Sequence, residues 1–540
     1  MRNRKLSVIL LVSMVVVIVI VHGKTQSPQS PSSPAANLQV KQVTYLKASN
    51  AGVGDHFGCG GGLQAHAGNA VAISRDGNTI AIGAHQEKSN ARGLNGNQND
   101  DSLYDAGAVY VFVRRGDMWV QQAYIKASNT GENDNFGYFV ALSADGNTLA
   151  ATANWEASAA TGVNGNQNDN SMQQAGAAYV FVRTGDTWSQ QAYVKASNTG
   201  RAPASSEEFD DGDQFGTALS LSGDGNTLAV GAISEDSGAA GINADQKDDS
   251  KLSAGAVYVF TRTGTSWSQQ VYLKPKQIDA GDLFGFSLAL SFDGNVLAVG
   301  HYEEDGSSTV TNGPIDENLG GAGAICVFTR SGSTWTQSAY LKSLTPDGGD
   351  SLGAFVAISD DGNTIAADAL DEDTMANGVN AVRQGDRVLN TSAGAAYVFS
   401  RENGMWKQQA SFKPSNTGKE DWFGVRLALS GDGNTLAIAG SLEDSAAQGI
   451  NGHQDDNSAD EAGAVYFFRR NGATWTQQAY IKGSNTEAFD EFGSSIGLTR
   501  DGKTMVISAR GEDSAAKGVN GNQADNSADE AGAAYIFTID

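Results

Sequence analysis

The stretch that decides the fold is FGTALSLSGDGNTLAVGA at residues 215–232, followed after a polar segment by AGAVYVFTRTGTSWSQQVYLK at residues 254–274. The same unit recurs along the whole chain, and each copy carries an Asp-Gly pair after its opening dipeptide. Self-similarity at a regular period is typical of repeat architectures. The copies begin at Phe57, Phe136, Phe215, Phe284, Leu352, Phe423 and Phe492.

Each unit divides into four segments that read as strands. In the third copy, residues 217–221 alternate in polarity, residues 223–226 (Gly-Asp-Gly-Asn) are a tight-turn sequence, and residues 227–231 are a second apolar run. This pattern predicts a β-hairpin with a specified turn. Residues 256–260 predict a third strand, and the alternation over 267–274 predicts a fourth with one buried face.

Seven units of four strands predict an all-β protein, a seven-bladed β-propeller of four-stranded blades. The seventh unit ends at residues 535–538 without a fourth strand, whereas residues 40–50 resemble the fourth strand at 120–129 and precede the first unit. We therefore expect this N-terminal strand to complete the last blade and close the ring, which buries two sheet edges. An open solenoid is the alternative, and it leaves this offset unexplained.

The N-terminus predicts export. Basic residues precede an apolar run at 6–21, so residues 1–23 are interpreted as a signal peptide or an N-terminal membrane anchor. Residues 24–39 are a Ser/Pro-rich linker, and residues 40–540 are the propeller. Cleavage would give a secreted protein. Retention would give a cell-surface protein whose membrane contact is made only through residues 6–21.

Composition excludes some classes of function. The net charge of -25 repels nucleic-acid phosphate, so no nucleic-acid partner is expected. Two cysteines, Cys59 and Cys326, are too few for a disulfide framework and are interpreted as buried structural residues. The histidines show no zinc-site spacing, and each is expected to be a solvated loop residue. They are His22, His56, His66, His85, His301 and His453.

The repeat resembles the FG-GAP repeats of the integrin α-subunit propeller, most clearly at residues 228–232 (LAVGA) and 255–260 (GAVYVF). The resemblance implies the fold. It also implies calcium sites on an Asp-x-Asp-x-Asp-Gly loop between the first two strands of a blade. In this chain that connection is only residues 222–227, which supplies too few oxygen ligands, so those family sites are not expected here.

The longer connections between the second and third strands carry a different pattern, Gly-(Val/Ile)-Asn followed by further Asn and Asp. Oxygen-bearing side chains at this spacing would wrap a calcium ion, with help from the upstream pairs Glu235-Asp236, Glu443-Asp444 and Glu512-Asp513. The alternative is that they cap their own turns through local hydrogen bonds. No other cofactor is indicated. The candidate calcium ligands are Asn164, Asn166, Asp169, Asn243, Asp245, Asp248, Asn451, Asp456, Asn520, Asn522 and Asp525.

Export, a rigid ring and variable loops on one face predict an extracellular or cell-surface binding or adhesion protein that engages a protein or a glycan. Trp155 and Trp422 lie outside the repeat pattern and are candidate ligand contacts, whereas the fourth-strand tryptophans are expected to pack between blades. An extracellular polysaccharide-acting enzyme with carboxylates near the channel is one alternative, and a structural surface-layer component is another. Near-uniform repeats favour a protein that is not an enzyme.

Overall fold

The computed structural model describes residues 38–60, 68–200, 212–309, 311–313, 316–382 and 391–540. Residues Gln39–Asp540 form one compact unit. The expected export segment, residues 1–23, and residues 24–37 of the expected linker lie outside the described residues. Within the described ranges there is no helix long and apolar enough to cross a membrane.

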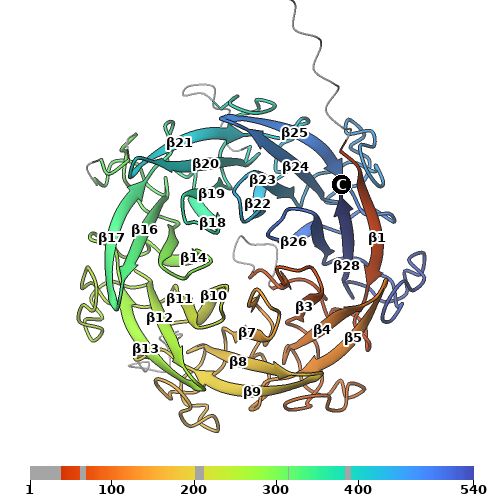
Figure 1. Cartoon of the computed structure of the whole chain (residues 1–540), viewed down its shortest axis with the longest axis horizontal. Helices are drawn as coiled ribbons and strands as arrows, with labels where there is room; N and C mark the ends of the chain where they lie inside the picture. The colour runs from red at the N-terminus through yellow and green to blue at the C-terminus, as the bar shows by residue number, and fades with distance from the viewer. Residues whose placement is uncertain (1–37, 61–67, 201–211, 310, 314–315, 383–390) are drawn as a thin grey trace, which may run out of the picture. The chain divides into compact units, whose positions relative to one another are not determined.

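The compact unit contains seven four-stranded antiparallel sheets, arranged as blades around a central axis (Figure 1). Blade 1 is β2 Val71–Ile73, β3 Thr79–Ala84, β4 Ala108–Arg115 and β5 Met118–Ile125; blade 2 is β6 Val140–Leu142, β7 Thr148–Ala153, β8 Ala177–Thr184 and β9 Thr187–Val194; blade 3 is β10 Phe215–Leu221, β11 Thr227–Ala232, β12 Ala256–Thr263 and β13 Ser266–Leu273. Blade 4 is β14 Phe284–Leu290, β15 Val296–His301, β16 Ala324–Ser331 and β17 Thr334–Leu341; blade 5 is β18 Leu352–Ile358, β19 Thr364–Ala369, β20 Ala395–Glu402 and β21 Met405–Phe412. Blade 6 is β22 Phe423–Leu429, β23 Thr435–Gly440, β24 Ala464–Asn471 and β25 Thr474–Ile481; blade 7 is β26 Phe492–Leu498, β27 Thr504–Ala509, β28 Ala533–Ile539 and β1 Val40–Leu46.

The short turn between the first two strands is fixed by its own side chains. In blade 3, Asn226 N donates to Asp224 Oδ1 at 2.9 Å, and Thr227 N donates to Ser222 Oγ at 2.9 Å. These hydrogen bonds hold the pKa of Asp224 below its usual value against the opposing effect of partial burial. The Asp of the Asp-Gly pair therefore stabilises the turn between the first two strands. The expected blades of four strands are confirmed by the seven four-stranded sheets.

The ring is closed by the N-terminal strand, as the sequence predicts. β1 pairs antiparallel with β28, from Val40 opposite Ile539 to Leu46 opposite Ala534. The open-solenoid alternative is excluded, because the last sheet has the order β1-β28-β27-β26 and so contains both ends of the propeller.

The core lies between neighbouring blades. Phe215 at the start of blade 3 packs edge-on against Tyr258 and Phe260 of the third strand, with ring centroids 5.6 and 6.1 Å apart. The fourth-strand tryptophans are at most 7% exposed and pack between blades, which confirms that interpretation; they are Trp119, Trp188, Trp267, Trp335, Trp406 and Trp475.

Candidate functional site

One face of the ring carries the connections between second and third strands (the 2–3 loops) and those from each blade to the next (the 4–1 loops). We call it the loop face. The opposite face carries the short 1–2 and 3–4 turns and is called the turn face. Figure 1 shows the 2–3 loops reaching outward past the outer strands β5, β9, β13 and β17.

The 2–3 loops fold back onto the outer strand of their own blade, and an asparagine fixes them there. In blade 3, Asn243 N donates to the Tyr272 carbonyl at 2.8 Å, and Tyr272 N donates to Asn243 Oδ1 at 3.0 Å. Ile242 forms an isolated bridge with Leu273. Asn243 has a positive φ of 52°, which asparagine tolerates better than most residues. The recurrent Gly-(Val/Ile)-Asn pattern thus extends the sheet edge.

Most of the candidate calcium ligands already accept hydrogen bonds. The side-chain oxygen of the first asparagine in each motif accepts a hydrogen bond from a backbone N–H of an outer strand; these asparagines are Asn164, Asn243, Asn451 and Asn520. Five side chains later in the motifs each accept a hydrogen bond from the backbone N–H two residues further along the chain; they are Asn166, Asp169, Asp245, Asn522 and Asp525. Asp248 and Asp456 make no side-chain hydrogen bond among the described residues. The turn-capping alternative is therefore observed at most positions.

The glutamates expected to help a calcium ion instead bind a lysine. Lys274 Nζ lies 2.6 Å from Glu235 Oε2, and Tyr272 OH donates to Glu235 Oε1 at 2.8 Å. Both charged side chains are at most 1% exposed, and burial lowers the pKa of Lys274 although the Glu235 charge opposes this. The interpretation of Glu235, Glu443 and Glu512 as calcium helpers is wrong, because a buried ammonium already compensates each carboxylate.

This ion pair, which we call the clamp, recurs in every blade and joins the 2–3 loop to the end of the outer strand. Its members are Lys47–Glu512, Lys126–Glu87, Lys195–Glu156, Lys274–Glu235, Lys342–Glu304, Lys413–Glu372 and Lys482–Glu443. Sequence reasoning missed the clamp. The available signal was a lysine at the end of each alternating fourth strand, on its buried side. Among the described residues no group of three or more His, Cys, Asp or Glu side chains is arranged to hold a metal ion.

Each 4–1 loop is held by a buried aspartate. In the loop leading to blade 2, Gly131 N donates to Asp134 Oδ2 at 2.7 Å. Burial and the nearby Glu156 charge raise the pKa of Asp134 to about 7. Asp55 and Asp421 behave alike, with pKa values raised to about 7 mainly by burial, and Asp490 reaches about 8.

Neighbouring blades are joined on the loop face by a ring of backbone hydrogen bonds. At each junction, the residue before the buried aspartate donates its N–H to a carbonyl at the end of the previous blade's 2–3 loop, at 2.6–2.9 Å. We call these pairs the junction ring. The pairs are Gly54–Asp529, Asn133–Tyr104, Gly212–Gln173, Gly281–Leu252, Gly349–Gly320, Glu420–Thr391 and Phe489–Asp460. The backbone arrangement is therefore uniform. Four of the seven donors are glycine, and the other three donors and most acceptors carry different side chains.

Trp422 lies beside this ring, directly after the buried Asp421, with a positive φ of 51° and partial exposure. Trp155 follows β7 on the same face and is 40% exposed. The two belong to blades 6 and 2, which are not adjacent, so the structure does not bring them together. Their role in ligand contact stays a prediction.

Three histidines are buried, contrary to the expectation that each is solvated. His301 Nε2 lies 3.0 Å from Asp282 Oδ2, and His85 Nδ1 lies 2.8 Å from the Cys59 carbonyl. Burial lowers the pKa of His56 to about 3 and that of His85 to about 4. The expectation was wrong because His85 and His301, at or directly after the end of a second strand, and His56, in the loop before blade 1, are all buried where neighbouring segments pack together. His453 is exposed as expected, and His22 and His66 lie outside the described residues.

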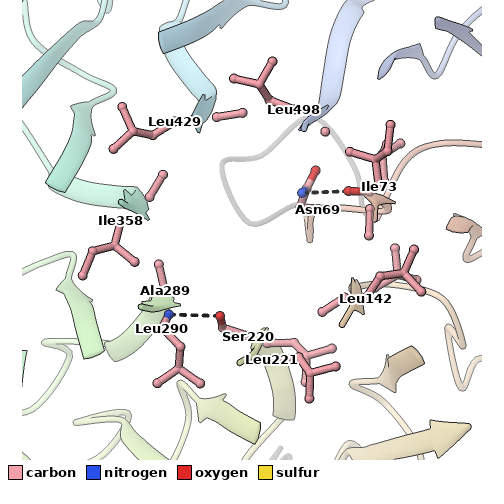
Figure 2. A pocket seen from close by; sticks show the side chains of 18 of the residues that line it. Asn69, Ile73, Leu142, Ser220, Leu221, Ala289, Leu290, Ile358, Leu429 and Leu498 are labelled. Atoms are coloured by element: carbon pink, nitrogen blue, oxygen red, sulfur yellow. Dashed lines mark hydrogen bonds between the residues drawn. The ribbon is translucent and has the colours of Figure 1, made fainter. Parts of the chain in front are cut away.

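The central channel holds a cavity of about 270 Å³ lined by the first strands of all seven blades (Figure 2). Leu221, Leu290 and Ile358 point away from the lumen, so small side chains such as Ala289 and strand backbone form its wall. Ser220 Oγ accepts a hydrogen bond from Leu290 N at 3.0 Å. No carboxylate is among the described residues that line this cavity.

The family comparison agrees with this repeat architecture. Residues 119–181 and 475–537 each match the family model described as the FG-GAP repeat. Each match runs from the outer strand of one blade into the third strand of the next, β5 to β8 and β25 to β28. No curated protein matches the chain. Among solved structures, the crystal structure of RRP9 WD40 repeats is similar, with 7% identity, a TM-score of 0.42, and coverage of 92% of this chain and 100% of that chain.

Proposed function

From a chain that carries FG-GAP repeats in a closed seven-bladed β-propeller, we propose an extracytoplasmic binding protein that engages a protein partner through its loop face. The observation that carries this proposal is a set of exposed apolar side chains at three junctions of the ring, two at the acceptor position and one at the donor position. Tyr104 is 66% exposed, Leu252 is 62% exposed and Phe489 is 59% exposed. Exposed apolar groups on a rigid surface mark interaction sites more often than they serve stability.

Phe489 supports this reading independently of its exposure. It has a positive φ of 67°, whereas most equivalent junctions carry glycine, or asparagine in the case of Asn133. The left-handed conformation costs a residue with a β-carbon about 1–2 kcal/mol. Because the ring of Phe489 is largely exposed, its packing offsets little of that cost. A strained and exposed aromatic side chain is a reason to infer a binding role.

The surroundings of Tyr104 and Phe489 favour a basic partner. Tyr104 is flanked by the exposed Asp101 and Glu132, and Phe489 by the exposed Asp460 and Glu487. An acidic rim around an apolar centre complements a partner that presents lysine or arginine around an apolar side chain. Such an arrangement favours a protein over a glycan at the loop face.

Export and location outside the cytoplasm are part of the proposal and rest on the charged and apolar pattern of residues 1–23. N-terminal sequencing of the protein recovered from medium and from membranes tests them. A mature N-terminus near residue 24 in the medium supports secretion, and an intact N-terminus in the membrane fraction supports an anchor. Recovery only from cytoplasm contradicts both.

Calcium binding by the 2–3 loops is a further part of the proposal. It is supported by Asp248 and Asp456, whose carboxylates have no hydrogen bond among the described residues. Calorimetric titration with calcium after chelation tests it. No heat and no change in melting temperature would remove calcium from the proposal.

The partner proposal is tested by screening the full-length chain against a panel of basic and acidic secreted proteins and a glycan array. We expect a basic protein to bind, with an affinity that falls as the salt concentration rises. The substitution Phe489→Asn should weaken binding at least about tenfold and leave the melting temperature unchanged or higher. Met405→Ser is the control, because Met405 is 61% exposed on the turn face.

The proposal fails if binding survives the combined changes Phe489→Asn, Tyr104→Ser and Leu252→Ser. A panel of extracellular polysaccharides incubated with the same preparation tests the proposed absence of catalysis. Release of reducing ends would favour the polysaccharide-acting enzyme instead.

A further inference from the structure

A groove of about 520 Å³ lies on the outer rim where blade 5 meets blade 6. One wall is the outer strand β25, from Trp475 to Ala479, and the other is the blade 5 loop at Gly378 and Val379. The groove does not include Tyr104, Leu252 or Phe489, although it shares the 2–3 loop residue Asn451 with the candidate calcium ligands. Its volume lies in the range of about 300–1,000 Å³ that is usual for small-molecule sites.

The chemistry of this groove is unusual for so acidic a protein. None of the described residues that line it carries a charge, although the chain has a net charge of -25. Its polar side chains are amides and hydroxyls, including Gln454, Gln477, Gln478 and Ser415. Amides supply both donors and acceptors, which matches a ligand whose hydroxyl groups also do both.

Gln478 is available here because of how the ring closes. In blade 1, the equivalent Gln122 accepts hydrogen bonds from Trp188 Nε1 at 2.9 Å and Arg183 Nη1 at 3.2 Å of the next blade. The same arrangement occurs at Gln191, Gln270 and Gln409.

Blade 7 lacks both donors. Val40 and Ile539 pair in its sheet at the positions where Trp267 and Arg262 pair in blade 3. The Gln478 oxygen is consequently left without a partner among the described residues, and its nitrogen donates to Thr476 Oγ1 at 2.6 Å.

A relay of side chains orients the rest of the groove. Gln477 Nε2 donates to Ser415 Oγ at 2.9 Å, and Ser415 Oγ donates to Gln454 Oε1. The relay uses the nitrogen of Gln477 and the oxygen of Gln454, so Gln477 Oε1 and Gln454 Nε2 remain to face a ligand. At Gln121, Gln190 and Gln269, the equivalent oxygen is buried and has no partner among the described residues. In blade 6, the equivalent Gln477 lines an open groove.

We propose that this groove binds one or more neutral sugar residues of a glycan. Gln477 Oε1 and Gln478 Oε1 would accept hydrogen bonds from sugar hydroxyls, and Gln454 Nε2 would donate one. Val379, which is partly exposed, supplies apolar surface for the sugar's C–H face. Because no charge is involved, affinity at this site should depend little on ionic strength.

Blade 4 offers a matched control. Thr336 occupies in β17 the position that Thr476 occupies in β25, and both are exposed. Around it, Gln337 Oε1 already accepts from Lys276 N at 3.0 Å, and Gln277 donates to Glu317. A tryptophan can therefore be introduced either in the neutral groove, as Thr476→Trp, or at the equivalent position of blade 4 beside charged residues, as Thr336→Trp.

The test is calorimetric titration of the full-length chain with neutral and acidic oligosaccharides chosen from a glycan array. We expect at least one neutral oligosaccharide to bind, with an affinity that is similar at low and high salt. Thr476→Trp should weaken binding at least about tenfold by filling the groove, and Gln454→Ala with Gln478→Ala should do the same by removing donors and acceptors. Thr336→Trp should leave it unchanged.

The proposal is overturned if no neutral oligosaccharide binds at millimolar concentration, or if Thr336→Trp weakens binding as much as Thr476→Trp. Its failure is separable from failure of the loop-face proposal. Loop-face binding should respond to Phe489→Asn and to salt and should ignore Thr476→Trp.

Discussion

At the scale of single residues, the clamp shows how a charge is kept inside this protein. Lys274 and Glu235 are almost fully buried, and Tyr272 and Asn198 complete the hydrogen bonds of the carboxylate. Two buried charges are tolerated when they compensate each other, whereas one alone is not. The clamp thus makes the position of each 2–3 loop depend on the end of its outer strand.

Removing one member of the clamp should therefore cost more than removing both. We expect Lys274→Met to destabilise the protein by about 3–5 kcal/mol, because Glu235 is left buried without compensation. The double change Lys274→Met with Glu235→Gln should cost clearly less. Urea unfolding of the two single variants and the double variant measures this. Additive effects of the two substitutions would contradict the account.

At the scale of elements, the 4–1 loops are predicted to respond to pH through their buried aspartates. The pKa of Asp134 is raised to about 7 in the folded chain, from an unfolded value near 3.8. The folded state therefore binds the Asp134 proton more tightly than the unfolded state does. The contribution of this proton to the free energy of unfolding is fully present below the unfolded pKa. This contribution is lost as pH rises from the unfolded pKa through about 7, at up to about 1.4 kcal/mol per pH unit.

Asp134→Asn isolates this effect, because asparagine can still accept the Gly131 N–H and does not titrate. We expect the variant to gain stability relative to the unsubstituted protein as pH rises from 4.5 to 7, and the difference to level off above about 7.5. Urea unfolding at several pH values measures it. Asp224→Asn is a useful comparison, because hydrogen bonds lower the pKa of Asp224 below its usual value. Its stability difference should therefore stay flat from pH 4.5 to 7, and should change, with the opposite sign, only below about pH 4. For Asp134→Asn, a difference that does not change with pH would contradict the assignment.

The elements themselves were predictable because their signals are local. The Gly-Asp-Gly-Asn turn fixes the first hairpin, and the alternation in the fourth strand fixes which face is buried. The contacts of the loops were not predictable in this way. Asn243 pairs with Tyr272, and Lys274 with Glu235, across separations of 29 and 39 residues that no local pattern reveals.

The same limit explains the errors at the candidate site. Asparagines in a repeated acidic loop resemble calcium ligands in sequence, but the folded loop brings Asn243 against a strand N–H. His85 resembles a loop residue in sequence, but the blade on its far side buries it. Both outcomes depend on which blade lies next to which, and this is decided only when the ring forms.

At the scale of the whole molecule, closure by β1 determines what the ring can do. Blade 7 takes its outer strand from the N-terminus, and this strand brings Val40 and Val43 where most blades carry tryptophan and glutamine. The Trp–Gln contact between blades is therefore interrupted beside blade 7, and Gln478 becomes available there. Blade 4 also departs from the pattern, because it carries Ser338 at the glutamine position. On the loop face, the backbone hydrogen bonds of the junction ring recur at every junction, and the variation between blades lies in the side chains that the ring carries.

Closure can be tested by removing β1. A chain that lacks residues 1–46 should lose the pairing of Val40–Leu46 with β28 and the hydrogen bond from Tyr45 OH to Glu512 at 2.7 Å. The exposed edge of β28 would then be free to pair with another chain. We expect a lower melting temperature and self-association, measured by calorimetry and light scattering. A chain that lacks only residues 1–37 keeps β1 and should remain a stable monomer under the same conditions. If both truncated chains melt and sediment alike, β1 does not hold the ring closed.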